Sequence, residues 1–148
     1  MLGRLFFRAP IVLYRIGLGS LMPMQLLITT VGRKSGQPRQ AVVDVLRHDA
    51  ATDTYYVVSA YGAHSDWYRN LQANRALCVQ VRRRKFPARA TALPPEEAEK
   101  VLLDYWRHHR LYARVTMRLV GLKAASEEDV RAAAGQLRVV AIEPEAGR

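Results

Sequence analysis

The chain has 148 residues, of which 49% are hydrophobic and 24% charged, and its formal net charge is +10. This size and composition fit one folded domain with its own core and exclude a largely disordered chain. A single cysteine excludes an internal disulfide and a cysteine-rich zinc site. The positive charge favours a polyanionic partner, for which nucleic acid, an anionic membrane surface and an acidic cofactor are the open alternatives.

The first 24 residues are predicted to form an amphipathic helix ahead of the main domain. Apolar or small residues recur there at the spacing of one helix face, with a proline suited to the first turn: Pro10, Leu13, Tyr14, Gly17, Leu18 and Leu21. The segment lacks a signal-peptide cleavage site and the ~20 consecutive apolar residues of a membrane span. We expect the helix to pack on the domain itself, and peripheral contact with an anionic membrane is the alternative.

Short runs rich in β-branched residues predict a main domain at 25–144, followed by a tail at 145–148. Strands are expected at 25–31, 39–47, 54–60, 76–82, 86–93 and 137–142, separated by turn-forming residues. The second run is apolar on both faces, which is typical of a closed barrel or a covered sheet. Helices are expected at 66–74, 95–110 and 126–135. The prediction is a mainly β, α+β fold: a compact β-barrel with peripheral helices.

The most informative motif is the loop at 32–39, which has the sequence GRKSGQPR. Two glycines and a proline enforce a tight turn, while Arg33, Lys34 and Arg39 supply cations and Ser35 a hydroxyl donor. Such a loop can hold phosphate or carboxylate oxygens, with about 1.5–3 kcal/mol for each charge-assisted hydrogen bond. It is not a P-loop, because no glycine-lysine-serine/threonine sequence leads from it into a helix. The alternative is a solvated basic hairpin.

A second cluster begins at Ser59 and continues into the helix expected at 66–74. A strand ends, Gly62 lets the backbone turn closely, and a helix begins beneath Trp67 and Tyr68. Backbone amides at a helix N-terminus favour an anionic group, and the aromatic rings offer a flat apolar wall. The alternative, favoured for Trp67, is that these side chains anchor the helix in the core.

The segments 26–39 and 67–74, in this order and at this separation, resemble the deazaflavin-dependent nitroreductase family. The resemblance extends from the N-terminal segment to Glu143 and Pro144. It implies a split β-barrel related to FMN-binding proteins, and an oxidoreductase that uses reduced coenzyme F420 to reduce a quinone, enone or nitro compound. FMN is the alternative cofactor, and a non-catalytic cofactor carrier or a membrane-surface anion binder is the alternative function. A cytoplasmic protein, at the inner face of the membrane if it is membrane-bound, is expected, and a homodimer is left open.

Carried over by position, the resemblance implies a cofactor site and one candidate catalytic residue. The cofactor-binding residues are Arg33, Lys34, Ser35, Gln37, Arg39, Val43, Ser59, Ala60, Tyr61, Gly62, Trp67, Tyr68 and Asn70. The loop cations and Ser35 would hold the phosphate and acidic tail, while residues 60–62 would line the deazaflavin ring. Tyr112 is the candidate catalytic residue, on the substrate side of that ring.

The basic run at 82–85, the neighbouring histidines and the single cysteine are expected to bind no ligand. The basic run at 82–85 lies at a hairpin tip without interleaved aromatic residues, so no nucleic acid partner is predicted. His108 and His109 are neighbours and point about 100° apart on a helix, so no metal site is predicted. Cys78 is expected to be an inert, partly buried thiol on a strand.

Overall fold

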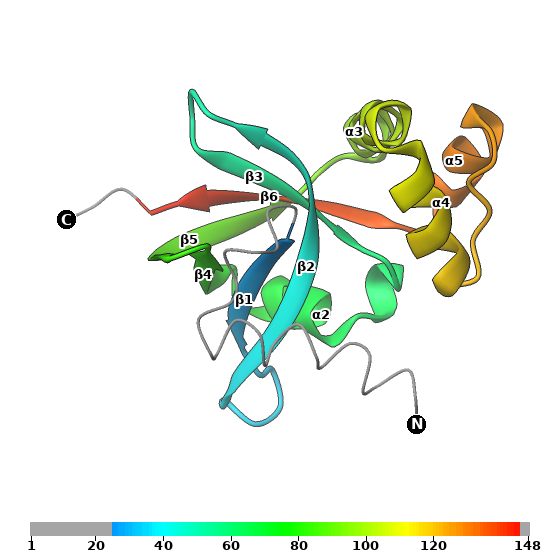
Figure 1. Ribbon diagram of the computed structural model, residues 1–148. Coiled ribbons are helices and arrows are strands. Elements are labelled where there is room, and N and C mark those ends of the chain that lie inside the picture. The colour runs from blue at the N-terminus through cyan, green and yellow to red at the C-terminus, as the bar shows by residue number, and fades with distance from the viewer. Residues whose placement is uncertain (1–24, 146–148) are drawn as a thin grey trace.

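Residues 25–145 are described by the computed structural model, in which six antiparallel strands close into a barrel (Figure 1). The strands are β1 (Gln25–Val31), β2 (Pro38–Asp49), β3 (Thr54–Ser59), β4 (Ala76–Val81), β5 (Arg84–Ala92) and β6 (Arg138–Pro144). Their order around the barrel is β1-β2-β3-β6-β5-β4, and β4 pairs with β1 to close it. The predicted barrel is therefore confirmed.

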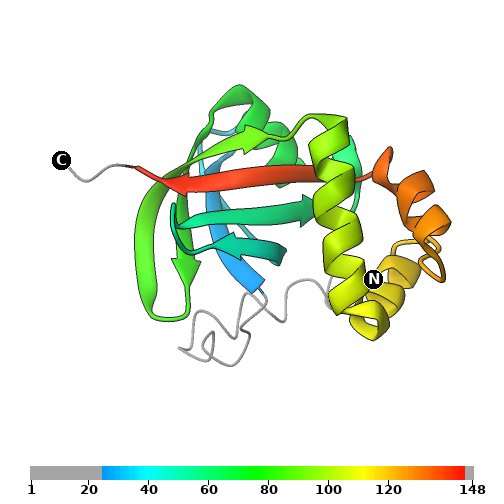
Figure 2. The same ribbon diagram turned by 90° about the horizontal axis from the view of Figure 1, so that it is seen from above.

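The helices of the described part divide between two sides of the barrel. They are α2 (Asp66–Ala73), α3 (Pro95–His108), α4 (Arg110–Leu119) and α5 (Glu127–Ala134), with a short 3₁₀ turn, η2 (Gly62–His64), before α2. Helix α2 packs against the barrel interior, whereas α3, α4 and α5 pack on the outer face. Figure 2 shows α3 lying across β3 and β6.

The inner core fills the barrel. Its most deeply buried members, all 0% exposed, are Leu26, Ile28, Val57, Val79, Ala88 and Ile142. Tyr68 and Leu71 of α2 join this cluster, so α2 shares the core of the barrel. A fully buried aliphatic or aromatic side chain contributes about 1.5–3 kcal/mol relative to an exposed one, which fixes α2 against this side of the barrel.

An outer core lies between the barrel wall and the outer helices. Successive side chains of a strand point to opposite faces, so Val57 faces the inner core while Tyr56 and Val58 contact the outer one. Trp106 of α3 is 5% exposed, and its indole nitrogen donates to the carbonyl of Ala124 at 2.8 Å. Strand β3 is thus covered on both faces.

Two expectations from the sequence are wrong. The helix expected at 95–110 ends at His108, because His109 adopts φ −133° and ψ 46°, and α4 follows as a separate helix that was not predicted. Cys78 is exposed on β4 rather than partly buried.

The expected N-terminal helix at 1–24 and the end of the tail, 146–148, lie outside the described residues. Within 25–145, no helix is both long and apolar enough to cross a membrane.

Candidate functional site

The loop between β1 and β2, residues 32–37, is held by its own hydrogen bonds; we call it the basic loop. The amide of Gly32 donates to the carbonyl of Gln37, and the amide of Gly36 donates to the carbonyl of Gly32, both at 2.8 Å. A Cβ on Gly32 would lie 2.7 Å from the Ser35 hydroxyl and 3.1 Å from the carbonyl oxygen of Gln37, so a larger residue would force the Ser35 side chain to turn away. The tight turn expected from the two glycines is present.

Arg33 and Asn70 tie the basic loop to α2. The backbone amide and the Nη1 of Arg33 donate to Oδ1 of Asn70 at 3.1 and 3.0 Å, and the Asn70 amide group donates to the Thr30 hydroxyl at 3.1 Å. Nη2 of Arg33 pairs with Asp66 at 3.2 Å. Asn70 is only 2% exposed, so these bonds are made in a buried setting that strengthens them.

Two cations are presented to solvent here: Lys34 of the basic loop and Arg39, which lies just after it at the start of β2. Both are exposed, and neither forms an ion pair with an acidic residue of the described part. Arg39 lies beside the Ser35 hydroxyl, with Nη2 at 3.4 Å. Two cations next to a hydroxyl fit an anionic group that carries phosphate or carboxylate oxygens. The positive charge of Arg33, in contrast, is shared with Asp66.

The turn from β3 into α2 is fixed by a close backbone contact. Gly62 has φ +60°, and a Cβ there would lie 2.0 Å from the carbonyl oxygen of Gln136, so only glycine fits. The Ser59 hydroxyl donates to the Gly62 carbonyl at 2.7 Å, and its oxygen lies 2.6 Å from that of Ser65. Ser65 holds the N-cap position of α2, but its side chain makes no capping hydrogen bond.

The other predicted cofactor residues fall into an exposed and a buried group. Ala60 and Tyr61 are exposed beside the turn. Val43 and Tyr68 are 4% and 8% exposed in the inner core, and Trp67 packs partly against it. The position of Trp67 against the inner core agrees with core packing, which was the favoured interpretation of this residue.

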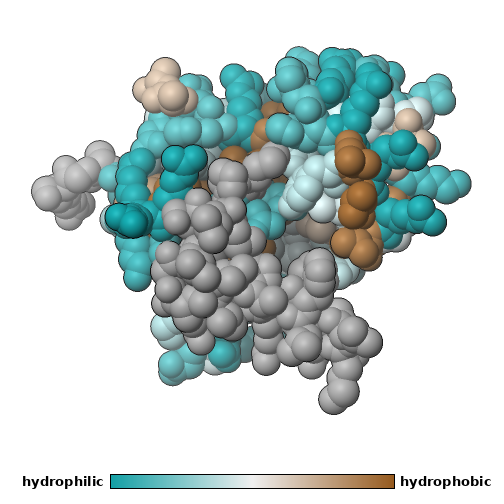
Figure 3. Space-filling model, in the orientation of Figure 1, coloured by the Kyte–Doolittle hydropathy of each residue, from teal (hydrophilic) through white to brown (hydrophobic). Residues whose placement is uncertain are grey.

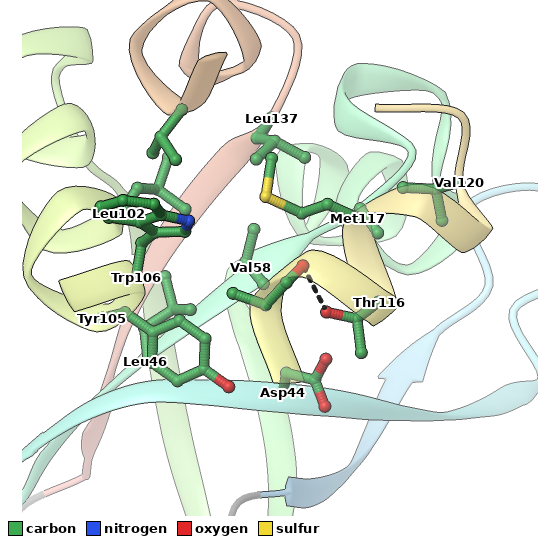
Figure 4. A pocket seen from close by; sticks show the side chains of 13 residues that line it. Asp44, Leu46, Val58, Leu102, Tyr105, Trp106, Thr116, Met117, Val120 and Leu137 are labelled. Carbon is green, nitrogen blue, oxygen red and sulfur yellow. Dashed lines mark hydrogen bonds between the residues drawn. The ribbon is translucent and has the colours of Figure 1, made fainter. Parts of the chain in front are cut away.

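A pocket lies on the outer face of the barrel, between the wall and helices α3 and α4 (Figure 4); we call it the outer pocket. Its cavity volume is about 60 Å³. The wall is mostly apolar, with Leu46, Val58, Leu102 and Met117 among its residues, and Ala60 also lines it. The turn expected beside the cofactor ring is therefore continuous with this pocket.

Three side chains with polar groups, those of Asp44, Tyr105 and Thr116, line the outer pocket, and Tyr112 adjoins it through a hydrogen bond to Asp44. Oδ1 of Asp44 accepts hydrogen bonds from the Gln25 amide group at 2.9 Å and from the Tyr112 hydroxyl at 3.0 Å. Burial, then the negative charge of Asp44 and the hydrogen bond to it, raise the pKa of Tyr112 to about 12. The Tyr112 phenol is therefore protonated at neutral pH.

Tyr105, which lies on α3, was not among the site residues expected from the sequence, because an aromatic residue in a helix is equally typical of a core position. The residue is 7% exposed, and its hydroxyl has no hydrogen-bond partner in the described part of the chain. Burial, followed by the nearby charge of Asp44, raises the pKa of this phenol above its usual value. Figure 4 shows the hydroxyl pointing toward the side of the pocket where Asp44 lies. Asp44, a lone acid in an apolar strand, was the signal available in the sequence.

No group of three or more histidine, cysteine, aspartate or glutamate side chains within 25–145 is arranged to hold a metal ion. The polar groups of the site are instead hydrogen-bond donors, cations and one carboxylate. Such groups can bind and orient an anionic cofactor and a small apolar substrate.

Solved structures show the class of this fold, the split barrel of FMN-binding and F420-dependent proteins. An F420H2-dependent reductase is 23% identical, with a TM-score of 0.55 over 81% of this chain and 94% of that one. A protein described as a domain-swapped dimer is 20% identical, with a TM-score of 0.55 over 90% and 99% of the two chains. An FMN-binding, pyridoxamine 5'-phosphate oxidase-related protein from Nostoc punctiforme is 11% identical, with a TM-score of 0.57 over 93% and 79%.

The chain belongs to the F420H(2)-dependent quinone reductase family, whose model matches residues 12–120. No curated protein matches the sequence significantly. The family identifies the protein as an oxidoreductase with coenzyme F420 as its cofactor. The resemblance noted in the sequence, the enzyme class and the choice of F420 are thereby confirmed.

Proposed function

We propose that the protein reduces a small, largely apolar electron acceptor bound in the outer pocket, and that a quinone fits this pocket best. The observation that carries the proposal is the buried Tyr105 hydroxyl, which lacks a partner in the described part of the chain. An unpaired buried phenol is unfavourable by about 1–3 kcal/mol, and a carbonyl oxygen would supply the missing acceptor. Quinones and enones offer such a carbonyl on an otherwise apolar ring; a nitro compound is the third acceptor class.

For the cofactor, Lys34 and Arg39 are proposed to hold the acidic tail, with Ser35 and Gln37 beside them. Arg33 and Asn70 then act by keeping the basic loop against α2, because their polar groups are already engaged with each other. Residues 59–62 form the turn proposed to lie along the ring. Since Ala60 also lines the outer pocket, the ring and the acceptor would meet at this turn.

Reduced F420 supplies a hydride, so the protein need only orient the acceptor, exclude water and deliver a proton. Reduction of a quinone to its hydroquinone takes one hydride and one proton. Tyr105 donates a hydrogen bond to the acceptor oxygen as negative charge develops there. Tyr112 is the proposed proton source, and it regains its proton from solvent because it is 37% exposed.

The cofactor assignment is tested by fluorescence titration with F420. The Lys34→Ala, Arg39→Ala double variant should bind about 100-fold more weakly, since two charge-assisted contacts are lost. Arg83→Ala, Lys85→Ala is the matched control, because it removes two exposed positive charges from another hairpin. Equal losses in the two double variants would mean that net charge, and not the basic loop, determines affinity.

The acceptor assignment is tested with Tyr105→Phe, which removes one oxygen atom. The variant should be about 1 kcal/mol more stable than the wild type, because an unpaired buried hydroxyl is gone. Its kcat/KM for a water-soluble quinone should fall on the order of tenfold, while F420 affinity stays unchanged. Unchanged quinone kinetics would remove Tyr105 from the acceptor site.

Three narrower assignments are part of the same proposal. Nitro-compound reduction would use the same pocket and the same Tyr105 donor. Contact of the N-terminal segment with the inner face of the cytoplasmic membrane concerns residues 1–24, so it is tested by deleting them before vesicle binding. A homodimer has its precedent in the domain-swapped dimer among similar structures and is tested by light scattering.

A further inference from the structure

Helix α4 has an apolar stripe on its outer face as well as on the face that lines the outer pocket. Leu111, Val115 and Leu119 follow one another at a spacing of four residues, and they are 78%, 53% and 62% exposed. Figure 3 shows a hydrophobic band over α4, bordered by hydrophilic surface. Side chains at i, i+4 and i+8 lie along one side of a helix, so the three residues form one continuous stripe.

A row of arginines lies directly beside this stripe. Arg110, Arg114 and Arg118 repeat at the same spacing, one position before each apolar residue. The guanidinium of Arg110 lies over the ring of Trp106, 4.9 Å from its centre, whereas Arg114 and Arg118 are exposed and form no ion pair with any residue in 25–145. The helix itself has no acidic residue. Apolar side chains bordered by cations are the pattern of a helix that lies in a membrane interface.

From this pattern we infer that the outer face of α4 docks on a bilayer that contains anionic phospholipid. The stripe inserts among the acyl chains near the headgroups, and the arginine row pairs with lipid phosphates. A second copy of the chain fits less well. A stable protein interface uses 20–30 residues on each side, and α4 has ten residues, some of which face the pocket. Each copy would also bring arginines without an acidic residue on α4 to pair with them.

The docking places the outer pocket beside the lipid. Ala113, Thr116 and Met117 of the same helix line the pocket, so one helix would contact the bilayer on one face and the acceptor on the other. If the proposed function holds, a quinone dissolved in the bilayer would reach the pocket along this helix. The docking itself depends only on the stripe and the arginine row.

Flotation of the full chain with vesicles tests the docking. Vesicles of phosphatidylcholine with phosphatidylglycerol should carry the protein upward at low salt, and vesicles of phosphatidylcholine alone should carry much less. Leu111→Gln, Leu119→Gln and, separately, Arg114→Gln, Arg118→Gln should each weaken binding on the order of tenfold. The control Arg83→Gln, Lys85→Gln loses the same charge as the arginine variant and should float like the wild type.

Several outcomes would overturn the inference. One is wild-type flotation of the leucine variant; another is equal loss in the arginine variant and its charge control. A third is a concentration-dependent dimer that the leucine variant abolishes, because the stripe would then hold a second copy.

Activity assays separate this inference from the proposed function. The leucine variant should reduce a water-soluble quinone at the wild-type rate and a vesicle-embedded quinone on the order of tenfold more slowly, because its docking is weaker. Flotation as expected without reduction of any quinone would refute the proposed function and leave the docking intact.

Discussion

Replacing Gly62 by alanine tests whether the turn between β3 and α2 depends on a close backbone contact. Gly62 and Gly36 share nearly the same backbone conformation, with φ +60° and +69°. A Cβ on Gly36 would meet no atom within 4 Å, whereas one on Gly62 would lie 2.0 Å from the Gln136 carbonyl oxygen. The pair of variants therefore separates the intrinsic strain of a left-handed residue from the steric conflict.

The two substitutions should differ by about 3 kcal/mol in the free energy of unfolding. Gly36→Ala should lower the free energy of unfolding by about 1 kcal/mol. A left-handed alanine is strained in the folded state, and the lower conformational entropy of the unfolded variant offsets only part of this strain. Gly62→Ala adds overpacking, worth about 1–3 kcal/mol. It also displaces the carbonyl that accepts from the buried Ser59 hydroxyl, a further ~1 kcal/mol.

Urea unfolding followed by tryptophan fluorescence measures both variants. Gly62→Ala should also have a Tm about 10 °C below the wild type, and it should bind F420 more weakly because the turn beside Ala60 shifts. If the two alanine variants unfold within about 0.5 kcal/mol of each other, the contact with Gln136 does not constrain the turn.

Three further predictions concern the polar groups of the site and the outer core. Spectrophotometric titration should show Tyr112 ionising near pH 12; Asp44→Asn should lower this pKa, yet keep it above 10 because burial is the larger cause. Since the pKa of Tyr112 is raised on folding, its contribution to stability is complete below pH 10 and should be lost as pH rises toward 12. Asn70→Ala should cost about 3 kcal/mol in urea unfolding through the lost bonds to Arg33 and Thr30, while Asn74→Ala, which loses only a bond to the Ala76 amide, should cost at most about 1. Trp106→Phe should destabilise by about 2 kcal/mol, because the buried carbonyl of Ala124 loses its donor.

The barrel was predictable because its signals are local in the sequence. Strand alternation, the glycines of the basic loop and the caps of the helices each depend on a few neighbouring residues. The break between α3 and α4 at His109 was not predictable, because the run of basic residues at 107–110 is compatible with a helix end anywhere within it. Tertiary contacts, such as the hydrogen bond of 2.7 Å that Arg107 donates to Glu127 of α5, hold the last turn of α3 only in the folded chain.

The candidate site divides in the same way. The basic loop is contiguous in sequence, so its cations could be identified directly, although the pairing of Arg33 with Asp66 joins residues far apart in the chain. The outer pocket assembles Asp44, Tyr105 and Ala60 from three distant segments. No periodic pattern connects such residues, and only the register of β2 with β3 and the packing of α3 bring them together.

The two cores give the cofactor and acceptor sites separate support. The basic loop and α2 are held by the inner core, through Tyr68 and Leu71, whereas Tyr105 and α4 belong to the outer core. Substitutions in two clusters that share no contacts have nearly additive effects. Substitutions around Tyr105 can therefore alter the choice of acceptor without weakening the affinity for F420. Because of this separation, F420 affinity reports on the cofactor site and quinone kinetics report on the acceptor site. A Tyr105 variant that changed both would show that the two cores are coupled.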